Sequence, residues 1–155
     1  MNLNSLEQQL LEIQKQINDC LNKEVAQHVK EQIMTAISIE VYGAGIPQIY
    51  VRRGGNVYGG MGNTMGTGSL ADPQEMHHTV SNCTLKVTDD AQPSNPGFGL
   101  ELDEAITYGY GRKNMWWNKP RPFLSEAVEN METTNSHVEV MKEGLEKRLG
   151  KGNVI

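Results

Sequence analysis

The sequence predicts an α+β fold: helical segments at both ends of the chain flank a small, mostly antiparallel sheet with long loops. Three observations lead there: apolar residues at helical spacing in the first third, alternating residues after position 82, and a well-marked helix start at Pro122. The chain has 155 residues, enough for one modest core. We therefore expect a single domain spanning residues 1–155.

The N-terminal helical region is expected over residues 1–42. Its first apolar residues step by three and four, as in a coiled-coil seam: Leu3, Leu6, Leu10, Ile13 and Ile17. The next apolar set lies out of phase with the first: Ala26, Val29, Ile33, Ala36 and Ile37. This shift predicts either a helix break near Asn18–Asp19, with one of these residues as the cap, or a change of packing partner there.

The β region is expected over residues 46–110. Ile49 and Val51 predict a short strand, and seven glycines in residues 54–68 predict a mobile loop. That loop contains neither GxxxxGK[ST] nor GxGxxG, which argues against a nucleotide site. Alternation from Cys83 to Val87 predicts the clearest strand, with residues 76–80 as its hairpin partner. The stretch LELDEAITYGYG predicts a short helix or strand that ends at Gly109.

A long C-terminal helix is expected over residues 122–150, with proline in its first turn and Gly150 as its stop. Its apolar stripe comprises Leu124, Val128, Met131, Val138, Met141, Leu145 and Leu149. Thr134 and Asn135 leave a polar gap in this stripe, and Gly144 weakens the helix.

Charge and composition narrow the classes of function. A net charge of −5 argues against a general nucleic-acid binder, which needs a basic surface. The absence of an 18-residue apolar run argues against a membrane span, and the N-terminus does not resemble a signal peptide. Cys20 and Cys83 are too few for a disulfide framework. These features favour a soluble protein with reduced cysteines in a cytoplasm.

No residues form a defensible catalytic constellation. His77 and His78 are adjacent, so on a strand they would point to opposite faces and could not readily share a metal. Arg52 and Arg53 could bind phosphate or a carboxylate, although one arginine of such a pair usually lies in solvent. We therefore expect no enzyme, no cofactor and no bound metal.

The stretch WWNKPRPFL, residues 116–124, is typical of a surface that docks onto another protein. Trp116 and Trp117 cannot both easily bury in one small core, and tryptophan is enriched at protein interfaces. The alternative, equally consistent with the sequence, is that both rings pack on the chain's own sheet and last helix. The prolines flanking Arg121 restrict the backbone, so this segment would lose little entropy on docking.

The order of several short motifs resembles the small neck or tail-completion proteins of long-tailed bacteriophages, the head–tail joining family. The motifs are PxxYxRR (Pro47, Tyr50, Arg52, Arg53), an aliphatic-Asp-Pro stretch (Leu70, Asp72, Pro73), the strand CTLKV, the YGYG turn at 108–111, and RPF at 121–123. The resemblance covers residues 5 to 148. The loop at 54–68 departs from it by being longer than expected.

The resemblance implies a structural virion protein of the phage neck, which completes the tail end or joins tail to head. It implies a homo-oligomeric ring, six- or twelve-fold, beside head-completion, tail-terminator or tail-tube proteins, with DNA only as passing cargo. The protein would be in the host cytoplasm during assembly and then in the virion. Candidate interface residues are Tyr50, Arg52, Arg53, Trp116, Trp117, Arg121 and Phe123.

Three other interpretations remain open at this point. Within the same class, the chain could be a tail terminator or a head-completion (stopper) protein. A small DNA-binding or regulatory protein would use Arg52 and Arg53 on phosphates and dimerise through its N-terminal seam. A metal-dependent hydrolase would use Asp72, His77 and His78, and it ranks far behind the others.

Overall fold

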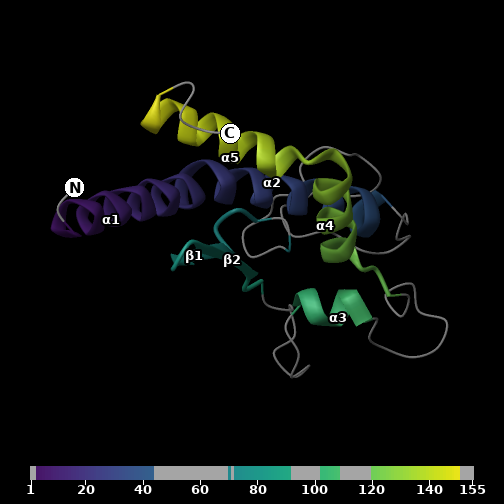
Figure 1. The fold of residues 1–155 in the computed structure, drawn as a ribbon. Helices are drawn as coiled ribbons and strands as arrows, with labels where there is room; N and C mark the ends of the chain where they lie inside the picture. Colours follow the sequence, from purple (N-terminus) through teal and green to yellow (C-terminus); the bar gives the residue numbers. More distant parts are fainter. Residues whose placement is uncertain (1–2, 44–69, 71, 92–101, 109–119, 151–155) are drawn as a thin grey trace. The chain divides into compact units, whose positions relative to one another are not determined.

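A computed structural model of the chain describes residues 3–43, 70, 72–91, 102–108 and 120–150 (Figure 1). The helices are α1 (Leu3–Cys20), α2 (Ala26–Ala36), α3 (Leu102–Tyr108), α4 (Phe123–Thr134) and α5 (Ser136–Leu149). π-Helical segments follow α1 (Leu21–Val25) and α2 (Ile37–Gly43). The strands β1 (Met76–Ser81) and β2 (Thr84–Asp89) form a two-stranded sheet. Helices at both ends and a small antiparallel sheet confirm the α+β prediction.

The N-terminal helix does not break at Asn18–Asp19, so that alternative was wrong. The π-helical segment Leu21–Val25 instead joins α1 directly to α2. A π turn inserts one extra residue, because its hydrogen bonds run from i to i+5. The buried positions accordingly step by five from Cys20 to Val25. The change in phase is therefore absorbed inside one continuous helical run.

The predicted C-terminal helix is two helices rather than one. Asn135 separates α4 from α5 and adopts a left-handed conformation with φ of 53°. Asparagine is among the few residues that tolerate this conformation. Its carbonyl oxygen then accepts the N–H groups of Val138 and Glu139, at 3.0 and 3.1 Å, which starts α5. The polar gap noted in the sequence thus marks a real interruption.

The buried face of α4 also differs from the predicted stripe. Phe123, Ala127 and Met131 are buried at a spacing of four, whereas Val128 and Val138 are about half exposed. The large ring of Phe123 occupies the core, which turns the helix so that Val128 faces solvent. The end of α5 agrees with the prediction, since Gly150 has φ of 87° and its N–H bonds to the Glu146 carbonyl.

The sheet is a hairpin closed by Asn82 and Cys83, both at positive φ (50° and 59°). A two-residue loop with this backbone is a type I′ turn, whose twist suits a hairpin. Residues 76–80 were thus correctly predicted as the second strand. Cys83, however, lies in the turn rather than in the strand that was expected to begin with it. The stretch before Gly109 is the helix α3.

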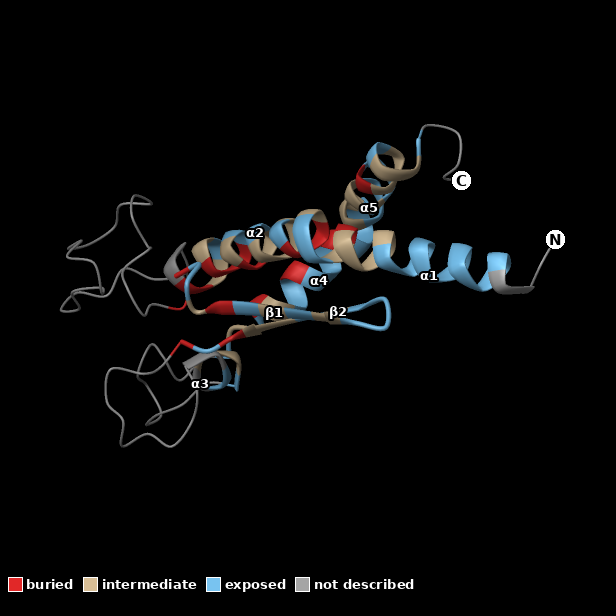
Figure 2. Ribbon diagram, turned by 90° about the vertical axis from the view of Figure 1, so that its left-hand side faces the viewer, coloured by how far each residue is buried: buried red, intermediate tan, exposed pale blue. Residues whose placement is uncertain are grey.

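Contacts within the chain group into two compact units. The first comprises Met1–Val29, His78–Val87 and Met131–Ile155, and the second Lys30–His77 and Thr88–Asn130. Both units combine stretches far apart in sequence, and the prediction of a single domain stays a prediction. Both units contain buried residues (Figure 2). In the first unit they include Cys20, Val25 and Gly144, and in the second Ile37, Leu70 and Phe123. No helix among the described residues is long and apolar enough to span a bilayer.

Candidate interaction site

The approach to α4 is held by backbone and side-chain contacts of Arg121. The Arg121 N–H donates to the carbonyl oxygen of Ile106 in α3 at 3.0 Å. Its guanidinium Nη1 donates to the carbonyl oxygen of Val41 at 3.3 Å. The segment therefore links α3 and the end of the second π-helical segment to the start of α4, all within the second unit. Arg121 is half-buried between these elements.

Burial lowers the pKa of the Arg121 guanidinium from its ordinary value, and the negative charge of Glu40 partly opposes this. An arginine starts from such a high pKa that it stays charged at neutral pH. A half-buried, permanently charged fork beside helix carbonyls stabilises the local fold. Arg121 therefore has a structural role, whatever else it contacts.

Phe123 belongs to the interior of its unit, because its side chain is fully buried. It therefore does not lie on a surface where another protein could reach it, which differs from the prediction. Pro120 and Pro122, by contrast, are exposed on either side of Arg121. The other candidate interface residues fall outside the described residues: Tyr50, Arg52, Arg53, Trp116 and Trp117. The predicted strand at 49–51 and the predicted loop at 54–68 also fall outside them.

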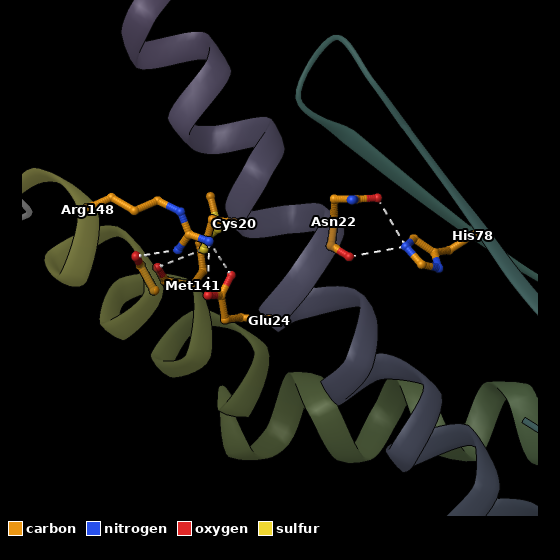
Figure 3. Close-up of polar contacts among 7 residues, drawn as sticks. Cys20, Asn22, Glu24, His78, Met141 and Arg148 are labelled. Carbon is orange, nitrogen blue, oxygen red and sulfur yellow. Dashed lines mark hydrogen bonds and ion pairs between the residues drawn. The ribbon is translucent and has the colours of Figure 1, made fainter.

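A polar clamp joins α5 to the first π-helical segment inside the first unit (Figure 3). Arg148 Nη2 donates to both carboxylate oxygens of Glu24, at 2.9 and 2.8 Å. Its Nη1 donates to the Gly144 carbonyl oxygen at 2.7 Å. Hydrogen bonds between an arginine and a carboxylate are shorter and stronger than those between neutral groups, because both partners are charged. The bond to Glu24 raises the pKa of Arg148 above its ordinary value.

Cys20, the last residue of α1, packs against Gly144 and Met141 of α5. A Cβ atom added to Gly144 would lie 2.5 Å from Cys20 Sγ, so no larger residue fits there without a shift. The same thiol donates to the Met141 carbonyl oxygen at 3.6 Å. Burial, and secondarily the Glu24 charge, raises the pKa of this thiol. A neutral, buried thiol is a packing residue rather than a nucleophile.

The two adjacent histidines contact different partners, as their positions on a strand predict. His78 Nε2 lies 3.1 Å from both the carbonyl oxygen and Oδ1 of Asn22 in the first π-helical segment (Figure 3). His77 lies on an exposed face, 3.8 Å from Asp90. Asp72 is buried and accepts the backbone N–H of Gln74. Across the described ranges, no three or more histidine, cysteine or acidic side chains gather where a metal could bind.

The N-terminal part of α1 has a face that the described residues of the chain leave exposed. Every residue from 5 to 15 is exposed (Figure 2). Leu6, Leu10 and Ile13, from the predicted coiled-coil seam, are 45%, 58% and 44% exposed. Cover begins further along, where the Cys83 N–H in the hairpin turn donates to Asn18 Oδ1 at 2.9 Å. These three residues form what we call the bare seam of α1.

Sequence reasoning did not find the clamp. It read Cys20 as a lone cysteine and Gly144 as a weak point in a helix. The signal was nonetheless present, because the step of five from Cys20 to Val25 is the spacing of a π turn. Such turns gather at functional sites and helix contacts, so the phase change could have directed attention to the residues that pack there.

The helices at both ends of the chain and the single hairpin define a small α+β protein. A family model named YomN matches residues 2–147, so the chain belongs to the YomN family. This is a phage-type family of Bacillus prophages, which points to a phage origin. No curated protein and no solved structure matches the chain.

Proposed function

We propose that the chain is a structural protein of the phage neck, which completes the tail end or joins the tail to the head as part of a ring. The observation that carries this proposal is the family membership across residues 2–147, taken with the ordered motifs that resemble head–tail joining proteins. Neither a fold nor a family name by itself gives a function, so the local structure must also fit.

The RPF motif supports the proposal through its local structure. Phe123 anchors the start of α4 in the core, and Arg121 fixes the preceding backbone to Val41 and Ile106. Pro120 and Pro122 are exposed, and the residue between them is held in place by these contacts. A preceding segment that docks on a neighbour would therefore leave from a fixed point, which lowers the entropy lost on assembly.

The exposed apolar residues of α1 support the same class of function. A monomer that works alone has no use for three neighbouring, half-exposed aliphatic residues, whereas assembly subunits commonly bury such surface on a partner. The described residues also provide no group of three or more side chains that could hold a metal. Assembly is the function that these features fit best.

The decisive experiment is deletion of the coding sequence from an inducible prophage, followed by electron microscopy of the lysate and mass spectrometry of purified wild-type particles. We expect filled heads and separate tails in the deletion strain, and this chain in wild-type particles. Complementation in trans should restore joined particles. Finding no trace of the chain in wild-type particles, together with normal joined particles in the deletion strain, would overturn the proposal.

The role of Arg121 is tested by complementing the deletion with Arg121→Ala and Arg121→Lys. Circular dichroism of each purified variant shows first whether it folds. If both fold and only Arg121→Ala fails to restore joining, the arginine also serves the interface. If Arg121→Ala is insoluble, the lost guanidinium bond to the Val41 carbonyl oxygen is needed for folding, and the role of Arg121 at an interface is contradicted.

A further inference from the structure

We propose that the bare seam of α1 pairs with the bare seam of a second copy of the chain, the two α1 helices lying side by side. The seam comprises Leu6, Leu10 and Ile13, on one face of a helix whose residues 5–15 are all exposed. The pairing would bury apolar area that the described part of the chain leaves in water.

The covered end of the same helix shows how the seam behaves when it has a partner. The seam runs on through Ile17 to Cys20, where α5 packs so closely that only glycine fits at position 144. The hairpin turn contacts the same end of the helix, at Asn18. The bare seam is thus the continuation of a helix–helix interface that the chain already uses.

A second copy fits the seam because the seam is complementary to itself. Residues stepping by three and four provide both the knobs and the holes of a helix pair. The flanking positions nearest the partner are Glu7, Gln9, Gln14 and Gln16. Three of these four are uncharged amides, and an amide both donates and accepts hydrogen bonds. In a parallel pair, Gln9 of one copy faces Gln14 of the other, so no row of like charges opposes pairing.

The pair should be weak between free chains and strong within an assembly. About two heptads bury less than the roughly 1,200–2,000 Å² typical of a stable complex. The helix is already formed and held at its C-terminal end by α5, which removes part of the ordering cost. When copies are held side by side, their effective concentration becomes high enough to fill a weak contact.

The proposal that two α1 helices pair does not depend on the proposed function. The parallel direction of the pair does rest on it, because it assumes that the copies form a ring. Copies related by rotation about the axis of a ring have helices that point the same way, so the pair would be parallel. An antiparallel pair would instead belong to a free dimer with a two-fold axis across the helices. The test below separates these cases.

The test compares Leu10→Gln with Leu11→Gln in the full-length chain. These neighbours are similarly exposed, at 58% and 63%, but Leu11 points about 100° away from Leu10, off the seam. Sedimentation from about 10 µM to about 1 mM gives the dissociation constant of the dimer. We expect Leu10→Gln, which removes two leucines per pair, to weaken dimerisation at least about 100-fold, and Leu11→Gln to leave it nearly unchanged.

The direction is tested by Leu6→Cys in a Cys83→Ser background, where the remaining Cys20 is buried. A disulfide needs Cα atoms within about 7 Å, which a parallel pair provides at position 6 and an antiparallel pair centred on Leu10 does not. Cross-linked dimers under mild oxidation are expected. Their absence, with Leu10→Gln still selective, overturns the parallel direction alone.

Two results overturn the pairing as a whole: a wild-type chain that stays monomeric over the full range, or equal weakening by both glutamine variants. Failure of the neck proposal looks different, because the chain would be missing from phage particles while the purified chain still dimerised through Leu10. Each hypothesis can therefore fail without the other.

Discussion

The two ends of α1 carry the same seam in opposite circumstances. At the C-terminal end, Cys20 is fully buried against α5, and the clamp of Glu24 and Arg148 lies one turn further on. At the N-terminal end, Leu6 and Leu10 lie about half exposed to solvent. Leu6, Leu10 and Cys20 all lie in the same α-helix, so their different exposure follows from the elements that neighbour them.

The comparison teaches that periodicity identifies a face of a helix but not what covers it. Steps of three and four place the apolar residues in a line, which local sequence determines. Cover depends on where α5 and the hairpin turn lie, and these are more than 60 residues away in the sequence. Breaking the covered end should therefore cost stability, whereas changes at the bare end should leave the free chain stable.

The largest effect is expected for Gly144→Ala. Alanine normally improves a helix by about 1 kcal/mol over glycine. Here its Cβ would meet Cys20 Sγ at 2.5 Å, and overpacking of this kind costs about 1–3 kcal/mol or more. A contact of 2.5 Å calls for the upper figure, about 3 kcal/mol, so the clash should outweigh the helix gain by about 2 kcal/mol in the free energy of unfolding, measured by urea denaturation.

The matched control is the double variant Cys20→Ala with Gly144→Ala. Removing the sulfur removes the clash, so the double variant should be more stable than the sum of the single changes predicts. Strict additivity would show that Cys20 and Gly144 do not press on each other, and the account of the covered end would be wrong.

The second effect is expected for Arg148→Ala, which removes the bonds to Glu24 and to the Gly144 carbonyl. Charged hydrogen bonds in partly buried sites contribute about 1.5–3 kcal/mol, and the partial exposure of this pair favours the lower figure, about 1.5 kcal/mol. Lys147→Ala is the control, since Lys147 is exposed and should cost less than about 0.5 kcal/mol. Equal losses for both variants in urea denaturation would contradict the clamp.

The sequence predicted the elements whose signals are local. The Leu3–Ile17 spacing predicted α1, the alternation after residue 82 predicted the hairpin, and Gly150 predicted the end of α5. Each signal depends on residues within one or two turns of each other, where backbone preference and periodicity decide. The polar gap at Asn135 was visible too, but only a left-handed φ made it a break.

The candidate site could be predicted less well, because its contacts are long-range. Phe123 was expected at an interface and is instead the anchor of α4 in the core. The clamp joins Glu24 to Arg148, 124 residues apart, and the residues around each of them do not indicate that the two side chains will meet. Pairings of this kind depend on the tertiary arrangement, which propensity and motif order do not encode.

A third effect concerns alkaline pH. The pKa of Cys20 is raised above its ordinary 9.0 by burial, so the unfolded chain releases this proton at a lower pH than the folded chain. Stability from this group is therefore complete below about pH 9 and lost as pH rises through the folded pKa. Relative to wild type, Cys20→Ala should show a shallower loss of stability between about pH 9 and 11.

Cys83→Ala is the control for the alkaline experiment, because Cys83 is exposed in the hairpin turn. It should keep the wild-type decline with pH, since the other alkaline groups are common to all three proteins. The comparison concerns the slope with pH rather than absolute stability, as Cys20→Ala also leaves a small cavity. If Cys83→Ala flattened the decline as much as Cys20→Ala, burial against α5 would not be its cause.

The smallest effect is expected at the hairpin turn, whose contact with Asn18 marks the end of the cover over α1. Cys83 has φ of 59°, a conformation that costs most L-residues about 1–2 kcal/mol and glycine almost nothing. Cys83→Gly creates Asn-Gly, the preferred pair for a type I′ turn. Glycine also loses more conformational entropy on folding than cysteine, and this cost offsets part of the relieved strain. We therefore expect a net gain of about 0.5 kcal/mol in the free energy of unfolding.

Cys83→Ala separates backbone strain from loss of the thiol, because alanine keeps the strain and lacks the sulfur. It should therefore leave stability nearly unchanged, while glycine raises it. A gain from glycine should also slow amide hydrogen exchange in β1 and β2 without changing exchange in residues 5–15 of α1, since the turn covers only the far end of that helix. Slower exchange along the bare seam as well would show that the two ends of α1 are coupled, and that the contrast between them is smaller than the static contacts indicate.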